Sequence, residues 1–480
     1  MVEHVQSVYT CRDCEKNSAD DDVPFMKADM PAPLIKGSLA SPSAVAYIMY
    51  QKYVMYAPIY RQEKDWERQG MFLSRQTMTN WIIFCADKYL RPLYNRLRVI
   101  LLQHEVLHAD ESPIQVLREP EKSATSKSYM WLYRTSGDAE RHIVLYEYQP
   151  SRSHDHPELF LSGFTGYLHA DGFQGYHMLK GITIVGCWIH LRRHFTDALK
   201  SIPKEERASS VAQKAVLRIA GLFHMEDQWA NLPPEKRYRL RLEMSKPKAE
   251  EFFKWIRSQN ILPKSATGKA INYALLQQEW LMNVYLDGRT ELSNNRIENS
   301  VRPYALGRRN WLFCNSVSGA HACAIIYTII ESARANGLNL FEYLKFILGA
   351  APTAKEESID ALLPWGGRLY RTAVSCPNQN YRKRVPDMPR KSASKLMMEF
   401  VRDYLDGTND RLDFDLDFNY YLKKYYPGME RENPDMAECF LFYVAERGYD
   451  EAQGLSNAKR KKLIREQYDE FLSAMRDGFM

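Results

Sequence analysis

Three acidic residues of this chain stand in contexts that favour catalytic chemistry. Asp110 and Asp171 each end a short apolar run, in the strings LHADESP and LHADGFQGY, and Glu298 lies in the polar string NNRIENSVRPYALGRRNWLF. Carboxylates on separate elements are the ligands that hold divalent metal ions against a phosphodiester. We therefore expect Asp110, Asp171 and Glu298 to meet in one site that binds two Mg²⁺ or Mn²⁺ ions. The alternative for each acid taken alone is an ordinary solvated side chain.

Arginine residues follow Glu298 closely along the chain. Arg302, Arg308 and Arg309 lie in the same string, and guanidinium groups suit phosphate oxygens because they bind them in a bidentate manner. These residues are therefore predicted to contact a DNA backbone. A solvated helix face with ion pairs is the alternative interpretation of this set.

A further group of chemically capable residues lies in CWIHLRRHF, residues 187–195. Cys187 and His190 have side chains that can bind zinc, but two ligands do not complete a tetrahedral site. We expect His190, Arg192 and Arg193 to begin a helix beside a sheet and to contact phosphate or orient a ligand. A packed, purely structural role is equally compatible with the sequence.

Short segments rich in β-branched and aromatic residues surround these motifs. VLHAD (106–110), YMWLYR (129–134) and HIVLYEY (142–148) predict three antiparallel strands, and YLHAD (167–171) and ITIVGCW (182–188) predict two more. A helix is expected at 155–162 and another from about His190. His108 and His169 lie two residues before an aspartate and so on the same strand face as that aspartate, where they can orient its carboxylate. Histidines packed in the core or on the sheet face are the alternative. This order predicts a mixed α/β fold (α+β type) with helices flanking a mixed sheet.

The other stretches are predicted to be helical. Apolar spacing indicates helices over 41–103, where Gly70 breaks the pattern and Ser74 can cap a following helix. This arrangement fits a helix-turn-helix with Arg75 and Gln76 near DNA, and a plain helical bundle is the alternative. Residues 200–285 indicate an inserted helical subdomain. Ser293 can cap the helix that carries Glu298, sheet pattern resumes near Trp311, and two helices follow at 318–347.

Both ends of the chain differ from the middle. Residues 1–38 hold one CxxC pair, Cys11 and Cys14, which supplies half of a zinc site or two free thiols. Past residue 375 a basic stretch precedes an acidic one and then an aromatic helical tail. The net charge of +6 over 480 residues permits nucleic-acid binding without requiring it. No apolar run reaches about 18 residues and no secretion signal is evident, so we expect a cytoplasmic protein without membrane contacts.

Taken in series, several of these strings resemble a family of bacterial transposases, the insertion sequence 66 (IS66) family. They are HADESPIQVL, HADGFQGY, CWIHLRRHF, NNRIENSVRPYALGRRNWLF and the late IDALLPW. The resemblance implies a ribonuclease-H-like catalytic core with an Asp-Asp-Glu triad, here Asp110, Asp171 and Glu298. It also implies metal-dependent DNA cleavage and strand transfer, self-association on paired element ends, and small accessory transposition proteins.

The resemblance also has departures. Family members carry a zipper-like segment and two Cys pairs near the start, whereas Cys11 and Cys14 form one pair, so the start looks shortened. Ser112 stands where the family commonly has Thr. A nuclease that cuts without joining and a non-catalytic, regulatory DNA-binding protein are the alternatives to a transposase.

We expect the following division of the chain: 1–38, remnant of a zinc-binding region; 39–103, helical and a candidate helix-turn-helix DNA-binding domain; 104–199 and 286–350, catalytic core; 200–285, helical insertion; 351–374, C-terminal segment of the family; 375–480, accessory helical module.

Overall fold

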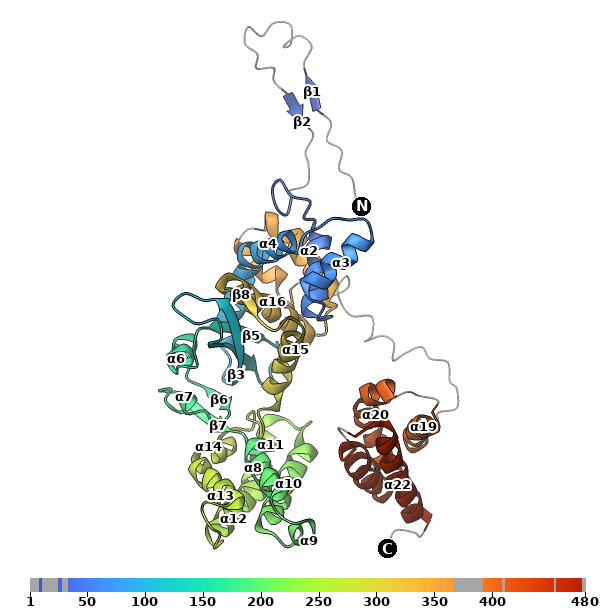
Figure 1. Cartoon of the computed structure of the whole chain (residues 1–480). Helices are drawn as coiled ribbons and strands as arrows, with labels where there is room; N and C mark the ends of the chain where they lie inside the picture. The colour runs from blue at the N-terminus through green and yellow to red at the C-terminus, as the bar shows by residue number, and fades with distance from the viewer. Residues whose placement is uncertain are drawn as a thin grey trace. The chain divides into compact units, whose positions relative to one another are not determined.

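Two compact units make up the chain in the computed structural model, Met1–Cys376 and Pro377–Met480. The structure describes residues 8–10, 25–27, 33–354, 356–366, 392–407, 411–452 and 455–476. Figure 1 shows the first unit built around a sheet and the second built of helices.

The sheet of the first unit has the strand order β5-β4-β3-β6-β7, with β8 pairing the far end of β3. Its strands are β3 Val106–Arg118, β4 Lys127–Thr135, β5 Val144–Gln149, β6 Tyr167–Ala170, β7 Thr183–Gly186 and β8 Cys314–Ser316. Strands β3, β4 and β5 run antiparallel, whereas β6 and β7 lie parallel to β3 and to each other. Three antiparallel strands followed by two parallel ones form the ribonuclease-H-like arrangement, so the predicted mixed fold is confirmed.

The central strand β3 is longer than the sequence predicted. It continues past Asp110 to Arg118, because Glu111 to Gln115 keep their pairing with β4 after β6 has ended. Its first residues are buried on both faces, as expected of a strand covered on both sides. Pro113 lacks a backbone N–H and lies in this later part, where β6 offers no partner. Asp110 therefore lies at the point where β3 and β6 part.

Helices cover the sheet, and one of them supplies hydrogen-bond partners to the edge strand β5. The apolar helix α16, Val317–Ala335, packs along β5. The hydroxyls of Thr328 and Ser332 accept hydrogen bonds from the backbone N–H groups of Tyr146 and Val144, at 2.9 and 3.0 Å. Two polar side chains in a buried helix thus replace the missing neighbour strand.

The N-terminal helices share one apolar core with the sheet. They are α2 Pro42–Tyr53, α3 Ile59–Arg68, α4 Arg75–Cys85, the π-helix η1 Ala86–Leu90 and α5 Arg91–Leu101. The hydroxyl of Ser74 accepts from the N–H of Thr77 at 3.1 Å, so the predicted cap is confirmed. Gly70 has a φ of +81°, which suits the turn before α4. Ahead of these helices, β1 Val8–Thr10 pairs with β2 Phe25–Lys27.

The helices that follow β7, over residues 188–286, form a second apolar core with the end of the sheet. They are α8 Trp188–Lys200, α9 Lys204–Arg207, α10 Val211–Trp229, α11 Pro234–Leu240, η2 Arg241–Ser245, α12 Lys246–Arg257, α13 Ala266–Leu276, α14 Gln278–Met282 and η3 Asn283–Leu286. Two short helices, α6 Asp155–Phe160 before β6 and α7 Gln174–His177 before β7, pack in the first core instead. Trp188 of α8 packs among Phe252 and Phe253 of α12. The indole N–H of Trp188 donates to the carbonyl of Leu281 at 3.0 Å. The insertion is therefore anchored on β7 and α8 (Figure 1).

The first unit ends in further helices after η3. They are α15 Asn295–Trp311, α16, α17 Leu340–Ala350, η4 Ala351–Thr353 and η5 Glu356–Leu362. Gly337, with a φ of +74°, separates α16 from α17 as the sequence indicated. The sheet resumes after Trp311 only as the three-residue strand β8.

The second unit is helical over its described residues. Its elements are α19 Ala393–Asp406, α20 Arg411–Glu432, α21 Pro434–Phe440, η8 Leu441–Asp450 and α22 Asn457–Arg476. Phe414, Phe418 and Phe471 belong to its own apolar cluster. Across both units, the described helices include none with the length and apolarity needed to cross a membrane.

Candidate active site

Asp110 and Asp171 occupy equivalent places on neighbouring parallel strands. His108 of β3 pairs with His169 of β6, and each aspartate follows its histidine by two residues. The two imidazole rings are stacked, with centroids 4.4 Å apart and an interplanar angle of 14°. Because residues two apart lie on the same strand face, both carboxylates lie beyond the stacked histidines where β3 and β6 part, Asp110 within β3 and Asp171 just after β6.

The pKa of Asp110 is affected by burial and by the acidic side chains around it. Burial raises the pKa of Asp110 well above its ordinary value, and the negative charges of Glu111 and Asp171 raise it further. Glu298 adds a smaller effect in the same direction. A hydrogen bond of 2.8 Å from the N–H of Glu111 to Oδ1 of Asp110 acts against this rise and fixes the carboxylate. A crowded group of carboxylates with a raised pKa is a frequent property of functional sites.

Asp171 is oriented in the same manner as Asp110. The N–H of Phe173 donates to Oδ1 of Asp171 at 2.9 Å. One oxygen of each aspartate is thereby held by the backbone, and Oδ2 of each remains for a ligand.

A fourth acid, Glu111, lies beside Asp110 and Asp171. The sequence did not predict a role for it. Its side chain is 3% exposed. Tyr176 donates to Oε2 of Glu111 at 2.8 Å, and Nε of Arg152 donates to Oε1 at 2.7 Å. Burial and the charge of Asp171 raise the pKa of Glu111, although Arg152 and Tyr176 oppose the rise. Arg152 also lies over the Phe173 ring, at 4.1 Å from its centroid.

Glu298 approaches the aspartates from the first turn of α15. Its Oε1 lies 3.6 Å from Nε2 of His190, and its Oε2 lies 3.6 Å from a guanidinium nitrogen of Arg193. Oε1 is buried and has no hydrogen-bond partner among the residues that the structure describes. The carboxylate is therefore close to positive charge but is not held by a short bond.

The segment ahead of α15 ties that helix to the sheet. Nδ2 of Asn294 donates to the carbonyl of Ala109 at 2.9 Å, and its Oδ1 lies 2.8 Å from Nδ1 of His108. The N–H of Glu291 donates to Nε2 of His169 at 3.0 Å. Both stacked histidines thus bind the segment that leads to Glu298, which agrees with a supporting role behind the aspartates.

Glu291 is itself held ionised in this segment. Burial would raise its pKa, but His108, whose Nε2 lies 3.7 Å from Oε1 of Glu291, and the charge of Arg296 bring it below the ordinary value. Nε of Arg296 lies 2.8 Å from Oε1 of Glu291.

The prediction that Ser293 caps α15 is wrong. The residue at the N-cap is Asn294, not Ser293, and its side chain makes no capping bond. The amide of Asn294 is instead occupied by His108 and Ala109, so contact with the sheet replaces the local cap.

The other predicted contact residues are distributed over two helices near Glu298. His190 and Arg193 of α8 face Glu298, whereas Arg192 is exposed on the same helix. On α15, Arg302 and Arg309 are exposed. The guanidinium group of Arg308 instead donates to the backbone carbonyl of Pro113 and joins α15 to β3.

Arg75 and Gln76 lie apart from this cluster, at the exposed start of α4. The N–H of Arg75 donates to Glu63 at 2.7 Å, and its guanidinium group lies 5.9 Å from the Tyr60 ring centroid. Gln76 donates to Asn80 at 2.9 Å. Their role in DNA contact stays a prediction. Cys11 and Cys14 fall outside the described residues, and so does the zinc site predicted for them.

The residues around Asp110 fit a hard divalent cation. Asp110, Asp171 and Glu298 offer oxygen ligands, their mutual repulsion calls for a positive charge, and Oε1 of Glu298 is buried without a partner. Two other groups have ligand atoms that lie within 4.8 Å of one another: Cys187, His190 and Glu298, and His154, Asp155 and Glu158. Groups able to hold a metal ion are thus present in the described residues.

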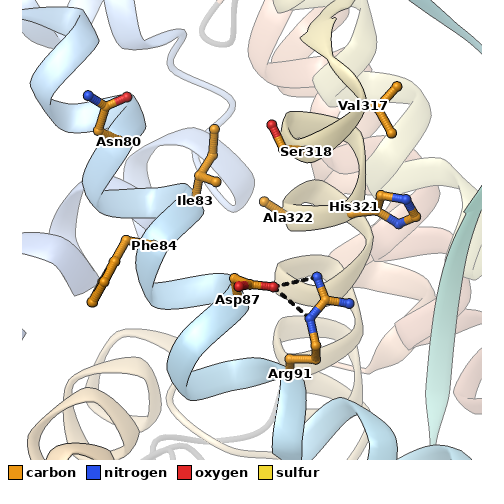
Figure 2. Close-up of a pocket in the computed structure, with 9 residues that line it drawn as sticks. All are labelled: Asn80, Ile83, Phe84, Asp87, Arg91, Val317, Ser318, His321 and Ala322. Carbon is orange, nitrogen blue, oxygen red and sulfur yellow. Dashed lines mark hydrogen bonds and ion pairs between the residues drawn. The ribbon is translucent and has the colours of Figure 1, made fainter. Parts of the chain in front are cut away.

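A separate pocket lies between α4, η1 and α16, with a volume of about 660 Å³. Figure 2 shows Asn80, Phe84 and Asp87 on one wall and His321 on the other. Asp87 pairs with Arg91 at 2.7 Å. None of the three acids lines this pocket.

The topology defines a ribonuclease-H-like protein with acidic side chains gathered at the ends of its central strands. The chain belongs to the IS66 family of transposases, because the model described as "Transposase IS66 family" matches residues 37–322. The "IS66 C-terminal element" matches residues 328–365.

Curated relatives come from Sinorhizobium fredii (strain NBRC 101917 / NGR234). Uncharacterized protein y4qI is 30% identical over 357 residues, which is 71% of this chain and 65% of that protein. Uncharacterized protein y4hP is 29% identical over 388 residues, which is 76% of this chain and 68% of that protein. The chain thus spans just under two thirds of the length of y4qI. Among solved structures, the Drosophila P element transposase strand transfer complex matches with a TM-score of 0.33 and 12% identity, over 61% of this chain and 92% of that one.

Proposed function

We propose that this protein is a DNA transposase that cleaves and transfers DNA strands with a triad of Asp110, Asp171 and Glu298. Family membership supports the transposase class. One observation carries the assignment of the site: His108 and His169 are paired in register, so the aspartates that follow each of them by two positions lie at equivalent places along adjacent strands.

The chain's own residues support this chemistry in defined ways. Asp110 and Asp171 would hold the metal from the sheet, and Glu298 would hold it from α15. Mg²⁺ or Mn²⁺ bound there supplies activation of the attacking water or DNA 3′-hydroxyl and stabilisation of the leaving oxygen. The N–H groups of Glu111 and Phe173 orient the aspartates before any ligand arrives, which favours a preorganised site.

DNA is the proposed partner. Arg192 and Arg193 of α8 and the exposed Arg302 and Arg309 of α15 lie on the two helices that meet at Glu298. Guanidinium groups beside an acidic site would bind the phosphates that flank the reacting bond. Arg75 and Gln76 are proposed as further DNA contacts, at the start of α4. We also propose self-association on paired element ends, together with small accessory proteins.

A strand-transfer assay tests this function. It uses the full chain, labelled DNA from the ends of the element that encodes it, and Mg²⁺ or Mn²⁺. Joined product is expected from the wild type and from Glu279→Gln, which alters an exposed acid on α14. Glu298→Gln should bind DNA normally and give no joined product. Cleavage without joining would indicate a nuclease, and binding with neither would indicate a regulatory DNA-binding protein.

A further inference from the structure

A cysteine, a histidine and a glutamate meet where α8 and α15 begin. Cys187 immediately precedes α8, His190 lies in its first turn, and Glu298 lies in the first turn of α15. Their ligand atoms all lie within 4.8 Å of one another. Sulfur, imidazole nitrogen and carboxylate oxygen are the three donor types that zinc sites in proteins use, and three protein ligands leave a fourth position open.

Two polar atoms of this group lack partners. Nδ1 of His190 and Oε1 of Glu298 are buried, and neither has a hydrogen-bond partner in the described part of the chain. The 3.6 Å between Nε2 of His190 and Oε1 of Glu298 is too long for a hydrogen bond. A cation bound between the three side chains would satisfy the glutamate oxygen.

The sulfur of Cys187 already faces several N–H donors. The backbone N–H of Asn294 lies 3.2 Å from Sγ, and the backbone N–H groups of His190 and Ile189 also point to it. Burial raises the pKa of Cys187 to about 11, and these donors oppose the rise. The same N–H groups would stabilise the thiolate that a metal ion would bind.

We propose that Cys187, His190 and Glu298 form a binding site for a thiophilic divalent cation, best matched by Zn²⁺. On binding, the Sγ–H bond breaks, a metal–sulfur bond forms and the proton passes to solvent. A mixed sulfur and nitrogen site prefers Zn²⁺ over Mg²⁺, which takes oxygen ligands. It therefore differs in selectivity from the carboxylate site.

The shared residue links the two sites. Glu298 would serve both Zn²⁺ here and the cation held by Asp110 and Asp171. Zn²⁺ would consequently draw the carboxylate away from the aspartates and inhibit strand transfer. This consequence rests on the proposed function, whereas the binding site itself does not.

Cobalt spectroscopy tests the site without any activity measurement. The full chain carrying Cys11→Ser and Cys14→Ser, which removes the CxxC pair, is titrated with Co²⁺, and thiolate-to-cobalt absorption in the near ultraviolet is followed. The band should appear, vanish in Cys187→Ser and require at least tenfold more Co²⁺ in His190→Gln. Cys439→Ser, which changes a thiol of the second unit, serves as the control and should keep the band.

The outcomes separate the two proposals. Absence of the band, or a band that survives Cys187→Ser, would overturn the zinc site. If the site exists, Zn²⁺ should lower Mg²⁺-supported joining at least tenfold, and the ratio of joining with and without Zn²⁺ should return toward one in Cys187→Ser. A cobalt band together with no joining in Mg²⁺ alone would leave the zinc site standing and refute the proposed transposase activity. Joining that Zn²⁺ leaves unchanged in a chain with the band would overturn the inhibition.

Discussion

Nδ1 of His108 lies 2.8 Å from Oδ1 of Asn294, and this contact joins the central strand to the residue that precedes the helix of Glu298. Because Nδ2 of Asn294 donates to the carbonyl of Ala109, Oδ1 is the acceptor and His108 is the donor. The two residues are separated by 186 positions in the sequence. This amide sets the start of α15 against β3 and so fixes where Glu298 enters the site.

Asn294→Ala should therefore destabilise the protein and slow joining. The change leaves the N–H of His108 and the carbonyl of Ala109 buried without partners, each at a cost of about 1–3 kcal/mol. We expect the free energy of unfolding to fall by about 2–4 kcal/mol in denaturant titrations. The control Asn295→Ala alters the exposed next residue and should change stability by less than about 0.5 kcal/mol. Equal stability of the two variants would contradict this role of the amide.

Gly172→Ala should lower joining because the insertion closes over Asp171. A methyl group on Gly172 would lie 2.9 Å from the hydroxyl oxygen of Tyr273 on α13. The tyrosine or the aspartate must then shift, and a misplacement of about 1 Å at a reacting site costs roughly 100-fold in rate.

The space around Gly172 can be tested by a second change. Tyr273→Ala in the Gly172→Ala background should restore part of the joining rate. Gly221→Ala on α10, where an added methyl meets nothing within 4 Å, should leave the rate unchanged. A normal rate for Gly172→Ala alone would show that Tyr273 does not restrict the site.

The pH dependence of stability should carry a contribution from Glu147 on β5. Burial raises the pKa of Glu147 from 4.5 to about 7. Since the folded state favours the protonated acid, its contribution is fully present below pH 4.5 and is lost as the pH rises through about 7. One unit corresponds to about 1.4 kcal/mol, so the whole shift corresponds to about 3 kcal/mol.

Glu147→Gln removes this titration. In thermal unfolding experiments, the stability of the wild type should fall more between about pH 5 and pH 8 than the stability of the variant. Glu140→Gln, which alters an exposed acid, serves as the control. Parallel pH profiles for the wild type and Glu147→Gln would exclude the contribution.

DNA binding should depend on Arg302 and Arg309 through phosphate contacts. Replacing both exposed residues with Ala should lower the slope of log affinity against log salt by about two, since each phosphate contact contributes about 0.9. Fluorescence anisotropy over a salt series measures this slope. Arg308→Ala should act mainly on stability, because that side chain binds the carbonyl of Pro113. An unaltered slope in the double variant would assign Arg302 and Arg309 to structure.

Local patterns of the sequence predicted much of the fold. The strands around VLHAD, YMWLYR, HIVLYEY and YLHAD were found because β-branched and aromatic residues alternate between turns. The sequence placed Asp110 and Asp171 each after a short apolar run, and the residues of those two runs pair in register. The Ser74 cap was equally local and was found.

The contacts that position the candidate site could not be predicted in this way. Asn294, Glu291 and Glu111 act through partners that are distant in the sequence, and polar residues outside a known pattern resemble solvated ones. The extension of β3 past Pro113 depends on pairing with β4 over residues 111–115. Cys187 and His190 gave two ligands in sequence, and the fold supplies Glu298 as the third. For Glu111, the sequence offered one signal, which is its position directly after Asp110.

Mn²⁺ binding tests most directly whether Asp110, Asp171 and Glu298 bind the catalytic metal together. Free Mn²⁺ is measured by electron paramagnetic resonance in the presence of element-end DNA, for the wild type, Asp110→Asn, Asp171→Asn and Glu298→Gln. Each variant should bind Mn²⁺ at least tenfold more weakly than the wild type while it keeps its affinity for DNA. Wild-type affinity for Mn²⁺ in any of the three would contradict the claim.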